Sequence, residues 1–364
     1  MRMTAATLYE PNGKFVFEEV ELQEPKEDEV LIKIVASGIC HTDAAVREQF
    51  IPVPLPAVLG HEGAGIVEKV GSNVKTIQPG DHVVLSFSSC GHCDNCVSGH
   101  PSNCERLNEF NFGGIMNDGT KRISKNGKEF SVFFGQSSFA TYAVAHVRNV
   151  VKIDKDVDLR KMAPLGCGIQ TGSGTIFNAL KPEFGSSIAI YGAGTVGMSA
   201  IMAAKIIGCS TIIAVDVHDH RLELAKELGA THVINGSKVD TLEEVRKITG
   251  SGTHYAMDST GVPSVIRQAL AGLKSRGVLA IVGATGDLTI NVQQELMGDG
   301  KSMIGVIEGD AIPQLFIPKL VDFYKKGKFP FDKLINFYKF EDLEKAFEES
   351  LAGKCIKPVV VMPD

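Results

Sequence analysis

The first part of the chain shows short apolar runs separated by turn residues. The run at 30–35 is apolar apart from Lys33, and the run at 65–70 alternates apolar residues with charged ones. The Pro-Gly-Asp sequence at 79–81 predicts a turn, and 82–85 predicts the strand that follows it. Turns at such short intervals are typical of a compact, barrel-like β domain.

After about residue 181 the pattern changes, and strand-like apolar runs alternate with helical stretches. This alternation predicts a parallel α/β sheet, so we expect a two-domain α/β protein. The predicted strands are 187–191, 211–215, 254–258 and 278–282, and the predicted helices are 196–207 and 221–228. From about Gly309 the sequence predicts helices at 317–325 and 341–351 and a strand at 359–361.

Composition agrees with a globular protein of two domains, because a single hydrophobic core stops growing at roughly 250–300 residues. The chain has 364 residues, 44% of them hydrophobic and 22% charged. Its net charge of −6, without runs of Lys or Arg, argues against nucleic acid or an anionic membrane as a partner. We expect a small-molecule substrate instead.

The N-terminal residues lead into charged positions such as Glu10 and Lys14, so we expect no secretory signal and a cytoplasmic location. The uncharged stretch 184–204 contains four glycines, which fits a buried strand, turn and helix better than a membrane span. In a reducing compartment, clusters among the eight cysteines indicate metal binding rather than disulfides.

Four cysteines lie within fifteen residues, at Cys90, Cys93, Cys96 and Cys104. Zinc favours such a tetrahedral set of four thiolates, which leaves no open position and is therefore structural. An iron–sulfur cluster is the main rival, but the ferredoxin pattern has its fourth cysteine after three residues and before a proline. Here seven residues intervene and Glu105 follows. Reactive, metal-free thiols are a third possibility.

Three other groups stand apart in the sequence, at Cys40, His61 and Cys167. Alone, each has an ordinary explanation: a buried cysteine is usually a small apolar residue, and a histidine beside Glu62 is usually a satisfied pair. Together they form the Cys2His set of catalytic zinc, whose fourth position holds water or substrate.

A glycine-rich turn follows the predicted strand 187–191 and opens the next helix. Gly192 permits the tight turn, Gly194 allows close approach of a pyrophosphate, and Gly197 lets the helix pack on the strand. Asp216 comes 19 residues after Gly197, where a carboxylate binds the ribose hydroxyls and disfavours a 2′-phosphate. The pattern predicts NAD rather than NADP, although Arg221 could weaken this preference.

The sequence Gly-His-Glu-Gly-Ala-Gly at 60–65, with Gly71, resembles the signature of zinc-dependent medium-chain alcohol dehydrogenases. The cysteine lobe, the glycine turn and the ending at 353–357 are similar to this family in the same order, and the aryl (benzyl) alcohol dehydrogenases are most alike. The resemblance implies a GroES-like catalytic domain at 1–171 with a structural-zinc lobe at about 90–104. It also implies a Rossmann NAD-binding domain at 172–308 and a segment, 309–364, that returns to the catalytic domain.

The resemblance also implies roles for individual residues. Cys40, His61 and Cys167 would hold the catalytic zinc, with Glu62 behind the metal and Asp43 accepting the outer N–H of His61. The residues expected at the cofactor, besides the glycine turn, are His41 and Lys357 at the pyrophosphate, Thr171 and Val196 at the nicotinamide, and Arg221 near the ribose.

The expected chemistry is removal of the alcohol proton and transfer of hydride to NAD. Thr42 is placed to accept the proton and to pass it along a hydroxyl chain. In the family this chain often ends at a histidine, where the present sequence has Ala45. The relay must therefore end in solvent, in water or at another residue such as His41.

The substrate is less well defined by the sequence. A given phenylalanine is as often part of the hydrophobic core as of a substrate pocket. The chain has 19 Phe and no Trp, so we expect an apolar cleft with aromatic walls that suits a benzylic alcohol. The residues expected to include pocket positions are Ile51, Phe87, Phe110, Phe112, Phe133, Phe134 and Ile307. The S-(hydroxymethyl)glutathione dehydrogenases also have alanine at position 45, but they bind their charged substrate through an acidic residue and an arginine where this chain has Ile51 and Asn108.

The same motifs are compatible with a general aliphatic or allylic alcohol dehydrogenase and with a non-catalytic cofactor-binding protein. Members of the superfamily that only bind the cofactor lack the Cys2His set, so zinc content would separate them from an enzyme. Relatives are dimers or tetramers, and we expect a homotetramer.

Overall fold

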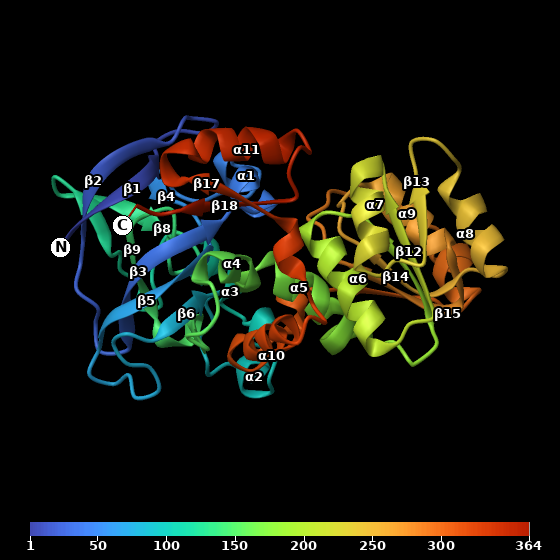
Figure 1. The fold of residues 1–364 in the computed structure, drawn as a ribbon, viewed down its shortest axis with the longest axis horizontal. Coiled ribbons are helices and arrows are strands. Elements are labelled where there is room, and N and C mark those ends of the chain that lie inside the picture. Colours follow the sequence, from blue (N-terminus) through green and yellow to red (C-terminus); the bar gives the residue numbers. More distant parts are fainter. Residues whose placement is uncertain (364) are drawn as a thin grey trace. The chain divides into compact units, whose positions relative to one another are not determined.

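The computed structural model describes residues 1–363, and their contacts divide the chain into two compact units (Figure 1). The first unit holds residues 1–168, 312–322 and the chain from 332 onward. The second unit holds 169–311 and 323–331, so part of the predicted returning segment groups with it.

The first unit contains a closed five-stranded barrel. β1 and β2 form its N-terminal antiparallel hairpin, in which Met3 lies opposite Val20. Alternation along β2 places Val20 and Leu22 in the barrel core and Glu19 and Glu21 outside, as a half-buried strand requires. In barrel order the strands are β1 (Arg2–Leu8), β2 (Val16–Leu22), β7 (Ile123–Lys125), β8 (Lys128–Val132) and β4 (Ala57–Val58).

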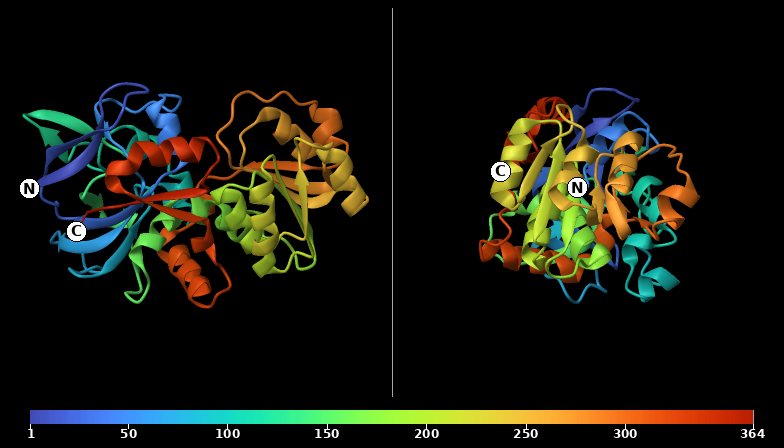
Figure 2. Two further views of the ribbon diagram at one scale, coloured as in Figure 1. Left: turned by 45° about the horizontal axis from the view of Figure 1, so that its top comes forward. Right: turned by 90° about the vertical axis from the view of Figure 1, so that its right-hand side faces the viewer.

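A seven-stranded sheet completes the β structure of this unit. Its central strand β3 is almost wholly buried, and β18 from the end of the chain pairs with it antiparallel, with Val360 opposite Ser37 (Figure 2). This pairing brings the C-terminal residues beside Ile39 and the start of α1. The strands are β10 (Val150–Ile153), β6 (His82–Leu85), β5 (Glu62–Val70), β3 (Glu29–Gly38), β18 (Lys357–Val361) and β17 (Ile335–Lys339), with β9 (Tyr142–His146) also paired to β3.

Short helices connect these strands, and a cysteine caps the N-terminus of two of them. Cys40 is the N-cap of α1 and Cys93 is the N-cap of α2. The helices of this unit are α1 (His41–Arg47), α2 (Asp94–Val97), α3 (Leu107–Phe112), α4 (Leu159–Met162) and α11 (Leu343–Leu351), together with the first part of α10 (Pro313–Lys325).

The second unit is a six-stranded parallel sheet with helices on its faces (Figure 1). The strands run outward from β11 to β13 on one side, and the chain then returns to place β14 on the other side of β11. Strand order therefore reverses at β11, the point at which such sheets bind ligands. The strands are β13 (His232–Asn235), β12 (Thr211–Asp216), β11 (Ser187–Tyr191), β14 (Thr253–Asp258), β15 (Leu273–Ile281) and β16 (Ser302–Gly305).

The helices of the second unit pack in pairs, α6 beside α7 and α8 beside α9. Their bounds are α5 (Gly168–Gly174), α6 (Thr195–Ile207), α7 (Asp219–Leu228), α8 (Thr241–Thr249) and α9 (Pro263–Ala271). A β-rich unit and a parallel α/β unit together confirm the predicted fold class. The uncharged stretch 184–204 contributes β11 and most of α6, and no helix among residues 1–363 has the length and apolar character that crossing a membrane requires.

Candidate active site

Four cysteine thiols meet in the lobe at residues 90–104. Their Sγ atoms lie within 4.8 Å of one another, with 3.9 Å between Cys90 and Cys96 and 4.0 Å between Cys93 and Cys104. Zinc with Zn–S distances of ~2.3 Å needs a sulfur tetrahedron with edges of about 3.8 Å. The four thiols therefore already have the spacing of a zinc tetrathiolate.

Backbone N–H groups surround these sulfurs and stabilise negative charge on them. Cys90 N–H donates to Cys104 Sγ at 3.2 Å, and Cys93 N–H donates to Cys90 Sγ at 3.3 Å. The N–H groups of Glu105 and Cys96 lower the pKa of Cys93 to about 6, whereas burial raises the pKa of Cys96 to about 12. Thiolates as close together as these repel one another, and a bound cation would offset that repulsion.

Three separate segments bring Cys40, His61 and Cys167 together. Cys40 caps α1, His61 immediately precedes β5, and Cys167 follows the helical turn η3 (Ala163–Gly166). One ligand atom from each residue lies within 4.8 Å of the others, and His61 and Cys167 are buried. The fold thus brings together the predicted Cys2His set, in which Cys167 is more than a hundred positions from the other two residues.

Asp43 fixes the orientation of the histidine in this set. Its Oδ1 atom is 3.0 Å from His61 Nδ1 and accepts from Gly60 N–H at 3.2 Å, while Oδ2 accepts from Cys40 N–H at 2.9 Å. With Nδ1 donating to this carboxylate, the lone pair of the neutral, metal-binding imidazole lies on Nε2. His61 Nε2 is buried and has no hydrogen-bond partner among residues 1–363, so it fits a metal ligand.

Electrostatics at this site favour the metal-binding form of the thiol. The neighbouring Cys167 thiol and then His61 hold the pKa of Cys40 well below its usual value, against the effect of burial. Burial opposes a charge on His61, but the Asp43 carboxylate raises the pKa of His61 well above its usual value. A thiolate is the form of cysteine that binds zinc, so the pocket prepares Cys40 for it.

Glu62 and Lys357 form a buried ion pair behind the ligands. Lys357 is only 2% exposed, and its Nζ donates to both Glu62 carboxylate oxygens and to Ile39 O, each at 2.9 Å. Burial and the nearby Cys40 thiol raise the pKa of Glu62, whereas Lys357 lowers it. A Glu62 oxygen lies within the same 4.8 Å group as the three predicted ligands. The pyrophosphate role predicted for Lys357 stays a prediction.

Aromatic rings enclose the histidine. Phe133 meets the His61 ring edge-on at 5.3 Å between centroids, and Phe134 lies tilted over it at 4.6 Å. Phe112 in turn contacts both rings, at 6.0 Å and 5.2 Å. This part of the site is therefore apolar and aromatic.

Gln136 also belongs to the site, although it lies outside every motif recognised in the sequence. Its buried amide accepts from Gly63 N–H at 3.2 Å and donates to His61 O at 2.9 Å and to Ser86 O at 3.1 Å. It therefore fixes the backbone on both sides of Glu62. No sequence pattern marks a lone glutamine for such a role.

The predicted cofactor turn has the expected geometry. Gly192 adopts φ 91°, and a Cβ atom on Gly197 would lie 1.7 Å from Gly192 O, so helix α6 can approach the turn only with glycine there. A Cβ on Gly194 would meet nothing within 4 Å, which leaves open space beside the start of α6. This is the cradle that a pyrophosphate requires at a helix N-terminus.

Asp216 ends β12 beside this turn. Its Oδ2 accepts from Ala193 N–H at 2.7 Å, and its Oδ1 accepts from Val217 and His218 N–H at 2.8 and 2.9 Å. Arg221 Nη1 lies 3.9 Å from Asp216 Oδ2. The aspartate thus also fastens the glycine turn, a role that its position in the sequence does not reveal.

The other predicted residues have varied surroundings. Phe87 and Phe110 are buried, and the Arg106 guanidinium lies 4.2 Å from the centre of the Phe110 ring. Half-buried Thr42 places its Oγ1 3.7 Å from Cys40 Sγ, and buried Ala45 lies on the same helix. Of the rest, His41 and Ile307 are exposed, Ile51 and Val196 are half-buried, and Thr171 is buried.

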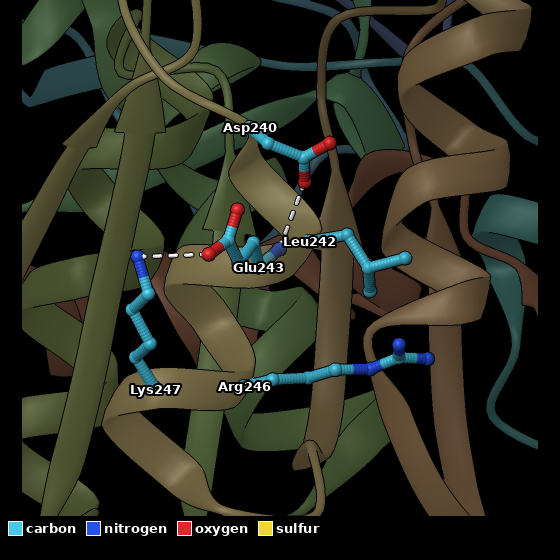
Figure 3. Close-up of a pocket in the computed structure, with 5 residues that line it drawn as sticks. All are labelled: Asp240, Leu242, Glu243, Arg246 and Lys247. Carbon is cyan, nitrogen blue, oxygen red and sulfur yellow. Dashed lines mark hydrogen bonds and ion pairs between the residues drawn. The ribbon is translucent and has the colours of Figure 1, made fainter.

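A separate surface hollow of about 520 Å³ lies along α8 (Figure 3). Asp240 caps this helix by accepting from Glu243 N–H at 2.8 Å, and Lys247 pairs with the Glu243 carboxylate at 3.1 Å. None of the predicted site residues lines this hollow, so we assign no function to it.

Comparison with known proteins agrees with this geometry. Residues 26–155 match the alcohol dehydrogenase GroES-like domain, and residues 195–326 match the zinc-binding dehydrogenase domain. The structure of benzyl alcohol dehydrogenase from Acinetobacter calcoaceticus superimposes with a TM-score of 0.96, at 45% identity over 100% of both chains.

Two curated relatives have other substrates in their names. Geraniol dehydrogenase of Castellaniella defragrans is 44% identical over 98% of this chain and 97% of its own. The probable S-(hydroxymethyl)glutathione dehydrogenase 1 of Schizosaccharomyces pombe is 37% identical over 98% of this chain and 96% of its own. With its two zinc sites and its NAD-binding unit, the chain belongs to the zinc-dependent, medium-chain alcohol dehydrogenases.

Proposed function

We propose that this chain catalyses the reversible oxidation of primary aromatic alcohols of the benzyl type to aldehydes, with hydride transfer to NAD. The observation that carries this proposal is the aromatic cluster in which Phe133 and Phe134 contact His61 and Phe112 packs against both of these rings. Aromatic rings gain specific edge and offset contacts with other aromatic rings, so this wall suits a planar, unsaturated substrate.

The metal-binding residues would act together on the alcohol hydroxyl. Cys40, His61 and Cys167 would hold zinc, whose Lewis acidity makes a hydroxyl more acidic when the metal is bound. Thr42, close to Cys40, would accept the hydroxyl proton. Asp43 would keep His61 in the tautomer that binds metal.

The second unit would orient the nucleotide for hydride transfer. Gly192, Gly194 and Gly197 would receive the pyrophosphate at the start of α6, and Asp216 would bind the adenosine ribose and disfavour a 2′-phosphate. Arg221 would lie near the same ribose. Thr171 and Val196 would contact the nicotinamide, and His41 and Lys357 would contribute at the pyrophosphate.

A second candidate substrate class is that of allylic alcohols. It is favoured by the 44% identity to a geraniol dehydrogenase, and an allylic alcohol also has an unsaturated carbon beside its reacting carbon. S-(hydroxymethyl)glutathione is disfavoured because Ile51 and Asn108 offer no charge to its carboxylates and ammonium group.

Steady-state kinetics with NAD would test these assignments. We expect kcat/KM for benzyl alcohol to exceed that for cyclohexylmethanol, its saturated counterpart of similar size, by about tenfold or more, which corresponds to about 1.4 kcal/mol. Geraniol, ethanol and S-(hydroxymethyl)glutathione complete the series. Equal values for benzyl alcohol and cyclohexylmethanol, or a clear preference for the glutathione adduct, would contradict an aromatic-alcohol enzyme.

We also propose that the enzyme is a cytoplasmic homotetramer. Light scattering coupled to gel filtration should give four times the chain mass of 39.0 kDa, and a mass of two chains would show a dimer instead.

A further inference from the structure

An unusual backbone turn lies in the second unit at η6 (Glu308–Asp310). Its three residues have φ values of 49°, 67° and 47°, so all three are left-handed although only Gly309 lacks a side chain. Non-glycine residues keep this conformation only where their surroundings fix it, and they are frequent at ligand sites.

Helix α5 and the π-helical turn η4 (Thr175–Leu180) provide these surroundings. Asn178 Nδ2 donates to Gly309 O at 3.0 Å. A Cβ atom on Gly174 would lie 2.4 Å from Gly309 O, and one on Gly309 would lie 2.4 Å from Gln170 O. The two backbones are therefore in direct contact, and the turn is fixed relative to α5.

The Glu308 side chain makes the polar contacts of this turn. It is 9% exposed, and its Oε2 accepts from Gln170 Nε2 at 3.1 Å and from Thr171 Oγ1 at 3.4 Å. Both donors are neutral groups on successive residues of α5, and both hydrogen bonds end on the same carboxylate oxygen. Thr171 is the residue that we place at the nicotinamide.

We propose that Glu308 is a positioning residue for the nicotinamide that also favours the oxidised form of the cofactor. Its carboxylate holds the Thr171 hydroxyl in place, and its negative charge attracts the cationic ring of NAD+ but not the neutral ring of NADH. Opposite charges attract more strongly where water is excluded, as it is around this side chain. The inference rests on the proposed nicotinamide role of Thr171.

Binding of the two nucleotides to the zinc-loaded enzyme tests this directly. The Kd of NADH would come from its fluorescence and the Kd of NAD+ from calorimetry. Glu308→Gln keeps an oxygen acceptor but removes the charge, and we expect it to raise the ratio of Kd for NAD+ to Kd for NADH about fivefold to tenfold. Glu308→Ala should raise this ratio similarly and also weaken NADH binding, because Thr171 loses its partner.

The control is Glu243→Gln, which removes an exposed carboxylate on α8 and should leave both affinities unchanged. Thermal unfolding would verify that each variant is folded. If Glu308→Gln does not fold, Glu308→Ala, which also lacks the negative charge, tests the effect of the charge on the Kd ratio. If the wild-type enzyme binds both nucleotides but the Glu308 variants keep its ratio of Kd for NAD+ to Kd for NADH, the inference about Glu308 is wrong and the proposed function stands. Failure of the wild-type enzyme to bind either nucleotide would overturn the proposed cofactor site, and the inference with it.

Discussion

Replacing Asp43 by asparagine should release zinc from the site of Cys40, His61 and Cys167 while the tetrathiolate keeps its own. The carboxylate accepts three N–H groups, from His61 Nδ1, Gly60 and Cys40, at 3.0, 3.2 and 2.9 Å. An asparagine has only one oxygen for these donors, so its NH2 group must face at least one N–H. His61 Nδ1 and Gly60 N–H share Oδ1 whereas Cys40 N–H uses Oδ2, so the NH2 group must face either the His61 side or the Cys40 side, and each side holds a metal ligand.

The expected loss of zinc affinity follows from the number of N–H groups that Asp43 accepts. Partners that orient a metal ligand typically contribute 10- to 100-fold to metal affinity, or about 1.4–2.8 kcal/mol. Because Asp43 serves both His61 and the Cys40 backbone and is fully buried, we expect Asp43→Asn to lie near the upper end of this range. Where the amide oxygen stays toward His61, it is an uncharged and therefore weaker acceptor for Nδ1–H.

Zinc transfer to a colorimetric chelator, followed by native mass spectrometry, would measure this effect. The wild type should retain two zinc ions per chain under conditions in which Asp43→Asn retains one. Asp240→Asn is a suitable control, because Asp240 likewise accepts from a backbone N–H, that of Glu243 in α8, but belongs to the second unit and is more than 70 residues from every cysteine ligand in the sequence. If Asp43→Asn loses zinc at the wild-type rate, or loses the tetrathiolate zinc first, the assigned role of Asp43 is wrong.

Three further predictions concern other parts of the molecule. Asp216→Ala should weaken NADH binding and reduce discrimination against NADPH in fluorescence titrations, because the ribose and Ala193 N–H both lose an acceptor; unchanged Kd ratios would contradict this. Cys40→Ser should abolish turnover with little change in Tm, whereas Cys93→Ser should lower Tm first, and identical behaviour would contradict separate catalytic and structural sites. Hydrogen bonds from neighbouring cationic and hydroxyl groups hold the pKa of Asp118 well below its ordinary value despite partial burial. Its stabilising contribution is therefore complete above about pH 4 and is lost as pH falls, so Tm of Asp118→Asn should fall less steeply with acid than wild-type Tm.

Features that are local in sequence could be predicted from the sequence. The glycine turn is defined by the strand before it, the helix after it and Asp216 one strand later, and β11 has the predicted bounds. The cysteine lobe is likewise a single short segment. Local spacing constrains these features because few residues separate the interacting groups.

Features that depend on contacts between distant segments could not be predicted in this way. Strand β2 has apolar residues on both of its faces, and only its pairing within the barrel shows that Val20 and Leu22 face a core whereas Val16 and Phe17 are exposed. Gln136 and Glu308 act through hydrogen bonds to residues 75 and 138 positions away, which leave no periodic pattern in the sequence. The convergence of the Cys2His residues rested on the family resemblance, because none of the three is unusual alone.

The two cysteine sites differ in chemistry because of what completes each of them. In the lobe, a fourth sulfur from the same segment fills the tetrahedron, so no position is left for a reactant. At the second site the fourth protein group within reach is the Glu62 carboxylate, and both its oxygens accept hydrogen bonds from Lys357. A buried carboxylate that is paired with an ammonium in this way is stabilised where it lies, since separating the pair would leave two buried charges without partners. Lys357, which comes from the strand that the C-terminal segment adds to the sheet, therefore favours a metal with three protein ligands and a position free for the alcohol.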